Sequence, residues 1–202
     1  MVTKQNIEQY KTKGYTYIDN FLPEKIATDL EKIYAENTKW ELIDQVRETH
    51  YQHVMKTESP YFPNEDEIFY GKFYRSNHLE KETYDIFDEY FKPTMKEFYK
   101  DKIMKYDYRC YKFDKGCHLR THIDDYTSMI GTTYYINKKW MWDWGGILHV
   151  GSETEFETLD SILPKFNRLV IMNHGVFRFP HFVSPVNDFA QNPRYTMVSF
   201  NE

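Results

Sequence analysis

Residues 106–124 read YDYRCYKFDKGCHLRTHID, and at this stretch the chain changes from a helical to a strand-like pattern. Two short runs of aromatic or β-branched residues, Tyr106–Phe113 and Leu119–Asp124, flank a turn at Asp114-Lys115. Runs bounded by turn residues are typical of antiparallel strands. More of them follow: Met129–Asn137, Gly146–Val150, Arg168–Asn173, Phe179–Ser184 and Tyr195–Phe200. Many short antiparallel strands need a closed or two-layered arrangement, which predicts a jelly roll, or double-stranded β-helix.

The residues before this stretch indicate helices and loops. Gly14–Leu22 alternates like a short strand, and Pro23 then opens a helix to about Glu36, because proline suits the first helical turn. A second helix fits Lys81–Tyr99, with a kink or a division at Pro93. Residues 40–77 show no sustained period, and we interpret them as long loops with short elements, which often act as lids.

These patterns predict an α+β chain in which N-terminal helices back the jelly roll. The 202 residues suit a single domain, residues 1–202, with a helical and loop-rich support at 1–102 and a jelly-roll core at 103–202. The net charge of −5 gives no reason to expect nucleic-acid binding. No apolar run is long enough to span a membrane, and the polar N-terminus does not resemble a signal peptide. Two cysteines make no disulfide framework, so we expect a cytoplasmic protein.

The triplet His122-Ile123-Asp124 ends a predicted strand and is the main candidate for metal binding. Alternate residues of a strand project to the same face, so His122 and Asp124 can bind one ion while Ile123 packs away. A second histidine from a distant strand would complete a set of two histidines and one carboxylate, which is diagnostic of non-haem iron(II) oxygenases. His181 is the best-placed candidate.

Two rivals contain similar residues. His78-Leu79-Glu80 has the same form, but it lies at a polar helix entrance with no strand to orient it. Asp125 is a nearer rival to Asp124, but on a strand it would point away from His122. Two further histidines, His149 and His174, fall in strand-like segments, where we expect core or pocket-rim positions.

Arg194 opens the last predicted strand, thirteen residues after His181. An arginine at that place can make a planar clamp of two hydrogen bonds on a carboxylate, a geometry that lysine cannot match. The alternative is a solvated charge at a strand end.

Several blocks of the sequence follow one another in an order that is known from one family. They are Cys110-Tyr111, His122-Ile123-Asp124, Thr133–Lys138, Gly145–Leu148, Leu163–Leu169, Pro180-His181 and Arg194-Tyr195. From Tyr108 to Phe200 the chain resembles the prolyl 4-hydroxylase branch of the iron(II)- and 2-oxoglutarate-dependent oxygenases, most closely the hypoxia-sensing type and its microbial relatives. The chain departs from them in two ways: Asn187–Pro193 is inserted, and Phe200 replaces a tryptophan.

The resemblance implies a role for individual residues. His122, Asp124 and His181 would bind iron, and Arg194 would pair with the distal carboxylate of 2-oxoglutarate; these four form the expected catalytic set. Three more residues would contact the co-substrate, namely Tyr135 by a hydrogen bond to the same carboxylate, and Tyr111 and Leu148 as parts of the pocket wall. Gly145-Gly146 looks structural, because glycines at this place would let the backbone lie close to a neighbouring segment.

The resemblance also implies an enzyme, a dioxygenase that hydroxylates a prolyl residue in a protein or peptide. It would use iron(II), 2-oxoglutarate and O2, with ascorbate as a supporting reductant, and would release succinate and CO2. Two alternatives are a hydroxylase of a free amino acid or other small metabolite, and a non-catalytic cupin-like binding module. We expect neither a nucleic acid nor a membrane as a partner, and the sequence does not predict the oligomeric state.

Overall fold

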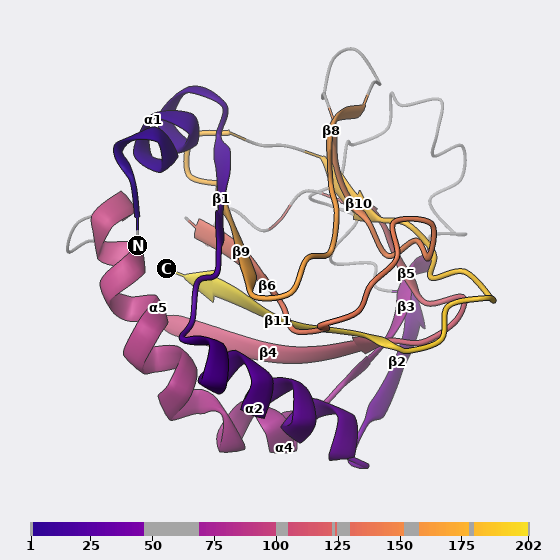
Figure 1. The fold of residues 1–202 in the computed structure, drawn as a ribbon. Helices are drawn as coiled ribbons and strands as arrows, with labels where there is room; N and C mark the ends of the chain where they lie inside the picture. The colour runs from indigo at the N-terminus through magenta and orange to yellow at the C-terminus, as the bar shows by residue number, and fades with distance from the viewer. Residues whose placement is uncertain are drawn as a thin grey trace.

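The computed structural model describes residues 2–46, 69–99, 105–122, 124, 130–151, 158–177 and 180–201. Helices gather along one side of a curled antiparallel sheet (Figure 1). The helices are α1 (Lys4–Thr12), α2 (Glu24–Glu36), α4 (Asn77–Glu82) and α5 (Tyr84–Tyr99). The strands are β1 (Tyr15–Asp19), β2 (Glu41–Val46), β3 (Phe69–Arg75), β4 (Tyr106–Phe113), β5 (His118–His122), β6 (Ile130–Tyr135), β7 (Leu148–Gly151), β8 (Thr158–Ile162), β9 (Arg168–Asn173), β10 (His181–Val183) and β11 (Arg194–Asn201).

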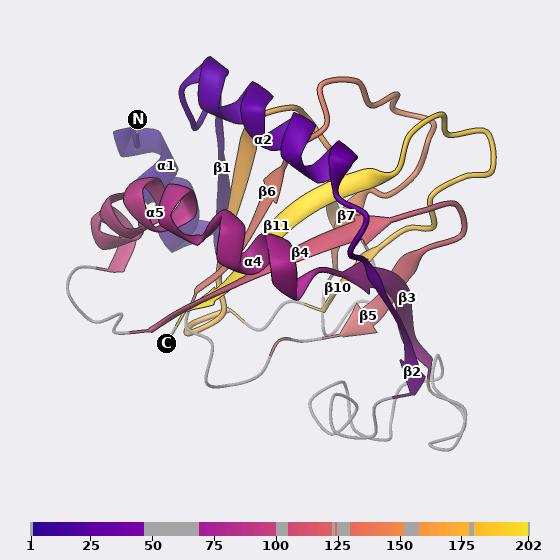
Figure 2. The same ribbon diagram turned by 90° about the horizontal axis from the view of Figure 1, so that it is seen from below.

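The strand order makes the sheet a jelly roll. The strands follow the order β1-β9-β6-β11-β4-β3-β5-β10-β7-β8, and β2 pairs with β3 beside this path. β3 pairs with β4 near Tyr74 and with β5 near Gly71, so it joins two halves of the sheet. The larger half contains β1, β9, β6, β11 and β4, and the smaller half contains β5, β10, β7 and β8. Figure 2 shows the same curled sheet from below. The predicted jelly roll with helices behind it is therefore confirmed.

The helices begin and end where local signals place them, with one exception. α2 starts directly after Pro23, as the sequence predicts. α1 was not predicted, although Thr3 and Asn6 form a capping box at its start. Of the kink or division expected at Pro93, the division is wrong, because α5 continues through Pro93 and the helical region divides at Thr83 instead. The Thr83 hydroxyl donates to the Leu79 carbonyl at 2.7 Å and so satisfies a terminal acceptor of α4.

Residues 40–77 contain two strands that local periodicity did not reveal. β2 and β3 pair with each other from Glu41↔Arg75 to Val46↔Phe69. Residues 47–68, which hold most of the predicted lid, lie outside the described residues. Along the described chain, no helix is both long and apolar enough to cross a membrane.

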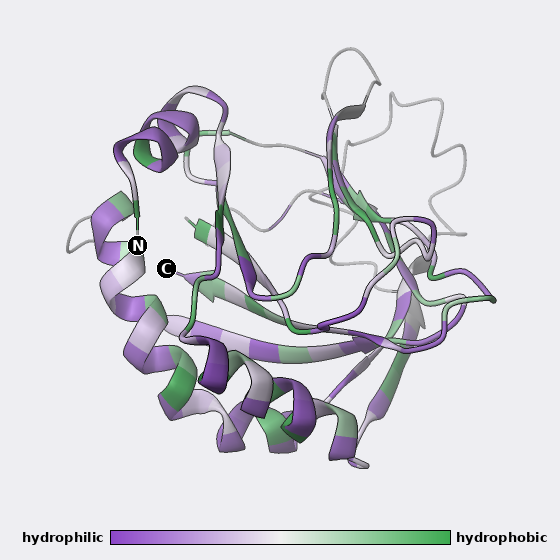
Figure 3. Cartoon of the chain, viewed as in Figure 1, coloured by the Kyte–Doolittle hydropathy of each residue, from purple (hydrophilic) through white to green (hydrophobic). Residues whose placement is uncertain are grey.

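Two hydrophobic cores lie on the two faces of the larger half of the sheet. One core joins the sheet to the helices and contains Phe87, Phe91 and Met95 from α5. The other fills the interior of the roll and contains Phe73, Phe113 and Leu148. Hydrophilic and hydrophobic bands alternate along α2 and α5, as expected for helices with one buried side (Figure 3).

Candidate metal and co-substrate site

Two histidines that lie far apart in the sequence meet because their strands pair. His122 ends β5 and His181 begins β10, and the two residues are direct partners in the antiparallel pairing of these strands. Their ring centroids are 4.3 Å apart. One possible ligand atom from each of His122, Asp124 and His181 lies within 4.8 Å of the others. Ile123 and Asp125, on which the predicted strand faces depend, lie outside the described residues.

The geometry of the triad suits a divalent metal ion. Nε2 of His122 lies 3.4 Å from Oδ1 of Asp124, and Nε2 of His181 lies 3.7 Å from Oδ2. Nδ1 of His122 lies 2.7 Å from the Arg120 carbonyl oxygen. Because a carbonyl oxygen can only accept, Nδ1 of His122 carries a proton, and Nε2, on the carboxylate side, is the ring atom that would bind a metal.

Asp124 is held in its ionised form. Burial alone raises the pKa of this carboxyl group. The charges of His181 and His174 and the hydrogen bonds from His122 and His174 outweigh that effect, so the pKa of Asp124 lies well below its usual range. A buried anionic oxygen beside two imidazole nitrogens is the donor set that non-haem iron(II) sites use.

Arg194 is the first residue of β11 and lies inside the roll, not at the surface. It is 2% exposed, and its guanidinium lies over the rings of Phe113 at 4.9 Å and Tyr135 at 5.0 Å. Burial lowers the pKa of its guanidinium. Within the described part of the chain Arg194 forms no ion pair, and its Nε has no well-formed hydrogen bond. A buried cation without a partner is unfavourable, so this position suits an anionic ligand.

Two hydroxyl groups near Arg194 also lack well-formed hydrogen bonds to described residues. They belong to Tyr135, which was predicted, and to Thr196, which was not. Thr196 lies two residues after Arg194 on the same strand, so the alternation of strand faces could have identified it. Nε of Arg194, the hydroxyl of Tyr135, which interacts with Arg194, and the hydroxyl of Thr196 thus gather at one end of the roll without well-formed hydrogen bonds to described residues.

Gly145 and Gly146 leave room for this arrangement. Their φ angles are +73° and +63°, which favour glycine. A Cβ atom on Gly146 would lie 2.7 Å from Cδ of Arg194, and one on Gly145 would lie 2.0 Å from the Pro185 carbonyl oxygen. The predicted close approach of the backbone at this pair is therefore present.

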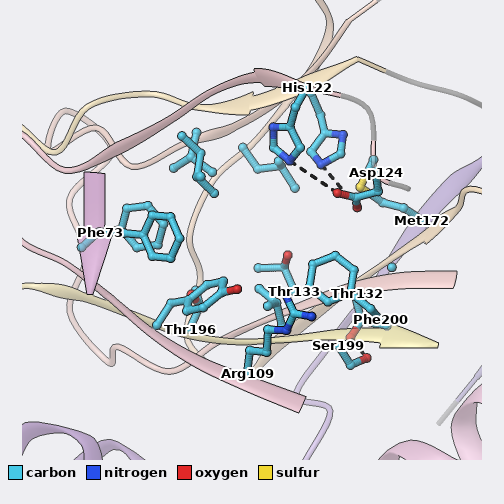
Figure 4. A pocket seen from close by; sticks show the side chains of 18 of the residues that line it. Phe73, Arg109, His122, Asp124, Thr132, Thr133, Met172, Thr196, Ser199 and Phe200 are labelled. Atoms are coloured by element: carbon cyan, nitrogen blue, oxygen red, sulfur yellow. Dashed lines mark hydrogen bonds and ion pairs between the residues drawn. The ribbon is translucent and has the colours of Figure 1, made fainter. Parts of the chain in front are cut away.

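A single cavity connects the two ends of the site. Figure 4 shows His122 and Asp124 on one wall, with Thr196 and Ser199 on the wall opposite. Tyr111, Leu148 and Arg194 line the cavity, whereas Tyr135 contributes through its hydroxyl beside Arg194 and is not among the lining residues. The cavity lining also contains Ile43, Phe73, Arg75, Arg109, Phe113, Leu119, Gly131, Thr132, Thr133, Met172, His174, His181, Val183, Val198 and Phe200.

Other candidates from the sequence lie elsewhere. His78 and Glu80 are in α4, where Glu80 binds Arg75 at 2.7 and 2.9 Å. The inserted segment 187–193 packs on the loop before it: the backbone N–H of Asn187 donates to Trp144, and its side chain donates to the carbonyl of Asp143. No residue of this insertion is among the residues that line the cavity.

A jelly roll with this triad, and with a buried arginine in the same cavity, has the features of a non-haem iron(II) oxygenase. Residues 106–201 match the family model of the 2OG-Fe(II) oxygenase superfamily. This region, which holds β4 to β11, belongs to that superfamily, and the chain is a 2-oxoglutarate-dependent oxygenase. The family implies iron(II), 2-oxoglutarate and O2, as the sequence predicted. A search of curated protein sequences found no significant match.

Solved structures with a similar fold come from several organisms. A Pseudomonas putida prolyl-4-hydroxylase is 16% identical, with a TM-score of 0.64 over 98% of this chain and 97% of that one. A Trichoplax adhaerens prolyl hydroxylase, in complex with a peptide fragment of hypoxia inducible factor, is 18% identical, with a TM-score of 0.66 over 97% and 86%. HygX from Streptomyces hygroscopicus, with nickel, 2-oxoglutarate and hygromycin B bound, is 10% identical, with a TM-score of 0.62 over 99% and 87%. At these identities the likeness shows the fold alone.

Proposed function

We propose that this oxygenase hydroxylates a prolyl residue in a protein or peptide and releases succinate and CO2. The observation that carries the oxygenase site is Arg194, a buried cation without an ion-pair partner in the described chain, in the same cavity as His122, Asp124 and His181. A dicarboxylate such as 2-oxoglutarate can bind the metal at one end and the guanidinium at the other. We also expect a cytoplasmic location, because a reducing compartment suits both iron(II) and the free thiols of Cys110 and Cys117.

Each residue of the site has one task in this proposal. His122, Asp124 and His181 hold the iron, and Arg194 binds the distal carboxylate of 2-oxoglutarate with help from the Tyr135 hydroxyl. The bound iron and co-substrate supply the oxidising chemistry that removes hydrogen from a substrate carbon. The protein orients both groups and keeps water away from them, since the triad and Arg194 are almost fully buried. Tyr111 and Leu148 form the wall beside the co-substrate.

Two observations support a prolyl substrate. The Trichoplax enzyme of the same fold is in complex with a peptide. In this chain the cavity wall carries the rings of Phe73, Tyr111 and Phe113, whose apolar faces suit a pyrrolidine ring.

A free amino acid or another small metabolite is the second candidate substrate. Arg109 lines the same cavity, and its guanidinium lies 4.6 Å from the centroid of the Phe200 ring. A second arginine in the cavity could bind the carboxylate of a free amino acid. HygX, which shares the fold, has the small molecule hygromycin B bound.

The experiment is a measurement of succinate formed from 2-oxoglutarate with iron(II), in the presence of prolyl peptides, free proline or other amino acids. We expect iron-dependent succinate, most of it with prolyl peptides, and almost none from Asp124→Ala, which leaves only two neutral imidazoles as ligands. Asp143→Ala, in the loop before β7 and outside the lining of the cavity, is the matched control and should retain activity. Undiminished succinate from Asp124→Ala would refute the site, and hydroxylation of free proline but of no peptide would reverse the order of substrates. A protein that binds 2-oxoglutarate without turnover would be the cupin-like binding module.

A further inference from the structure

His174 is a buried histidine beside the triad that the proposed function does not use. It directly follows β9, its side chain is 3% exposed, and it lines the same cavity. The sequence placed it only in the core or at the pocket rim. Its position next to Asp124 depends on how β9 and β6 bring distant segments together, which local sequence does not reveal.

The contact between His174 and Asp124 is the shortest that any histidine makes with this carboxylate in the described residues. Nε2 of His174 lies 3.0 Å from Oδ2 of Asp124, whereas the triad histidines lie 3.4 and 3.7 Å from its oxygens. The rings of His174 and His181 stack, with centroids 5.7 Å apart and planes 26° apart. Among the described residues, the group of ligand atoms that meets within 4.8 Å contains His122, Asp124 and His181 but not His174. His174 therefore lies beside the metal ligands and not among them.

Gly131 makes the space that this imidazole occupies. It lies inside β6, opposite Met172 of β9, and it is not one of the glycines with a positive φ angle. The backbone therefore does not require glycine here, and glycine inside a strand is unfavourable. A Cβ atom at this position would lie 2.3 Å from Nε2 and 2.7 Å from Cδ2 of His174. The absence of a side chain at residue 131 is thus what allows His174 to reach Asp124.

The ring nitrogens support the same conclusion. Both are buried, and neither has a well-formed hydrogen bond among the residues that the structure describes. Buried polar groups are normally paired, and an imidazole kept in such a place needs a favourable contact elsewhere. Asp124 provides that contact through Nε2.

We propose that His174 is a positioning residue for the metal site. Its Nε2 faces Oδ2 of Asp124 at 3.0 Å, and a proton on this nitrogen attracts the carboxylate and so restricts its rotation before the metal binds. Carboxylate ligands are commonly held by such outer hydrogen bonds, and loss of the partner typically lowers metal affinity about 10- to 100-fold. This inference rests on the proposed function only in taking Asp124 as a metal ligand.

The test measures Co(II) binding, because Co(II) stands in for iron(II) and its absorption bands report the ligand geometry. We expect His174→Phe, which keeps a ring but has no donor, to bind Co(II) about 10- to 100-fold more weakly and to shift the bands. His174→Gln keeps an N–H donor and should recover most of the affinity. Gly131→Ala keeps the imidazole but displaces it, so it should resemble His174→Phe.

The matched control is His149→Ala. His149 lies on the neighbouring strand β7, where it binds Ser161 at 2.9 Å and stacks on Phe182, so its loss should leave Co(II) affinity unchanged. Wild-type affinity in both His174→Phe and Gly131→Ala would overturn the proposal, and so would an equal loss in His174→Phe and His174→Gln. If His174→Phe does not fold, the comparison of Gly131→Ala with His174→Gln decides. Asp124→Ala tests the proposed function separately. If this variant still binds Co(II) with wild-type affinity, the assignment of the triad as the metal site is refuted.

Discussion

The two faces of the larger half of the sheet differ in how their polar groups are satisfied. On the face toward the helices, the Tyr34 hydroxyl donates to the Cys110 thiol at 2.8 Å and the Tyr134 hydroxyl donates to Asn167 at 3.0 Å, whereas the Tyr10 hydroxyl of the same core has no partner among the described residues. On the face toward the cavity, Arg194 Nε and the hydroxyls of Tyr135 and Thr196 have no such partners in the described chain.

Because of this difference, residues that stabilise the fold and residues that are proposed to bind a ligand alternate along the same strand. Along β11, Tyr195 and Met197 belong to the helix-side core, whereas Arg194 and Thr196 line the cavity. Buried polar groups are nearly always paired in folded proteins, so several unpaired groups on one face indicate a place that a ligand completes. Substitutions on the two faces should therefore have separable effects.

The largest effect is expected for Arg194→Ala. Loss of this partner leaves a carboxylate of 2-oxoglutarate buried without a counter-charge, which should weaken co-substrate binding by about 3–5 kcal/mol. Metal affinity should change little, and the free energy of unfolding should not fall, because the free protein pairs this cation with no described carboxylate. Calorimetric titration of 2-oxoglutarate and of Co(II) measures both affinities. Equal 2-oxoglutarate affinities in wild type and Arg194→Ala would show that another cation, such as Arg109, binds the carboxylate.

Met197→Ala tests the opposite face of the same strand. Met197 is fully buried against the helices, and removing such a side chain lowers the free energy of unfolding by about 2–5 kcal/mol. Urea unfolding gives this value. The 2-oxoglutarate affinity of the folded variant should stay at the wild-type level, and a weaker affinity would show that the two faces are coupled.

Tyr135→Phe should weaken 2-oxoglutarate binding by less than Arg194→Ala. It removes one hydrogen bond to a charged group, which contributes about 1.5–3 kcal/mol. Stability should be unchanged or slightly higher, because the hydroxyl is buried without a well-formed hydrogen bond in the free protein. Titration and urea unfolding of the same sample measure both effects. A stable variant with wild-type affinity would exclude the hydroxyl from the co-substrate site.

The smallest effect is expected at Asp19, which lies on the edge strand β1 and belongs to neither core. Hydrogen bonds from Arg168 at 2.6 Å and Lys165 at 2.7 Å lower the pKa of Asp19 in the folded protein. The ion pair therefore stabilises the protein above the unfolded pKa of about 3.9 and is lost as the pH falls through the lower folded value. Since these side chains are partly exposed, we expect less than about 1 kcal/mol. Urea unfolding of wild type and Asp19→Asn should differ at pH 7 and converge once the pH falls below the folded pKa of Asp19; a constant difference would contradict this account.

The sequence by itself determined the strand-rich half of the fold and the main residues of the site. Strand alternation is a local property, so Tyr106–Phe113 was identified with the bounds of β4, and His122 and Asp124 were identified as one candidate pair. Arg194 was distinguished from a surface charge only by its place at the start of the last strand and by the family resemblance. These predictions need no knowledge of which strands pair.

Only the tertiary structure decided which distant segments lie side by side. β2 and β3 are separated by a long stretch of chain, and their pairing depends on backbone hydrogen bonds that no local pattern encodes. His181 lies beside His122 because β10 pairs with β5, and His174 reaches Asp124 because β6 has a glycine at residue 131. The physical reason is that such contacts depend on the register of paired strands and on the room left by a neighbour's side chain, whereas the sequence pattern specifies only the face on which each residue lies.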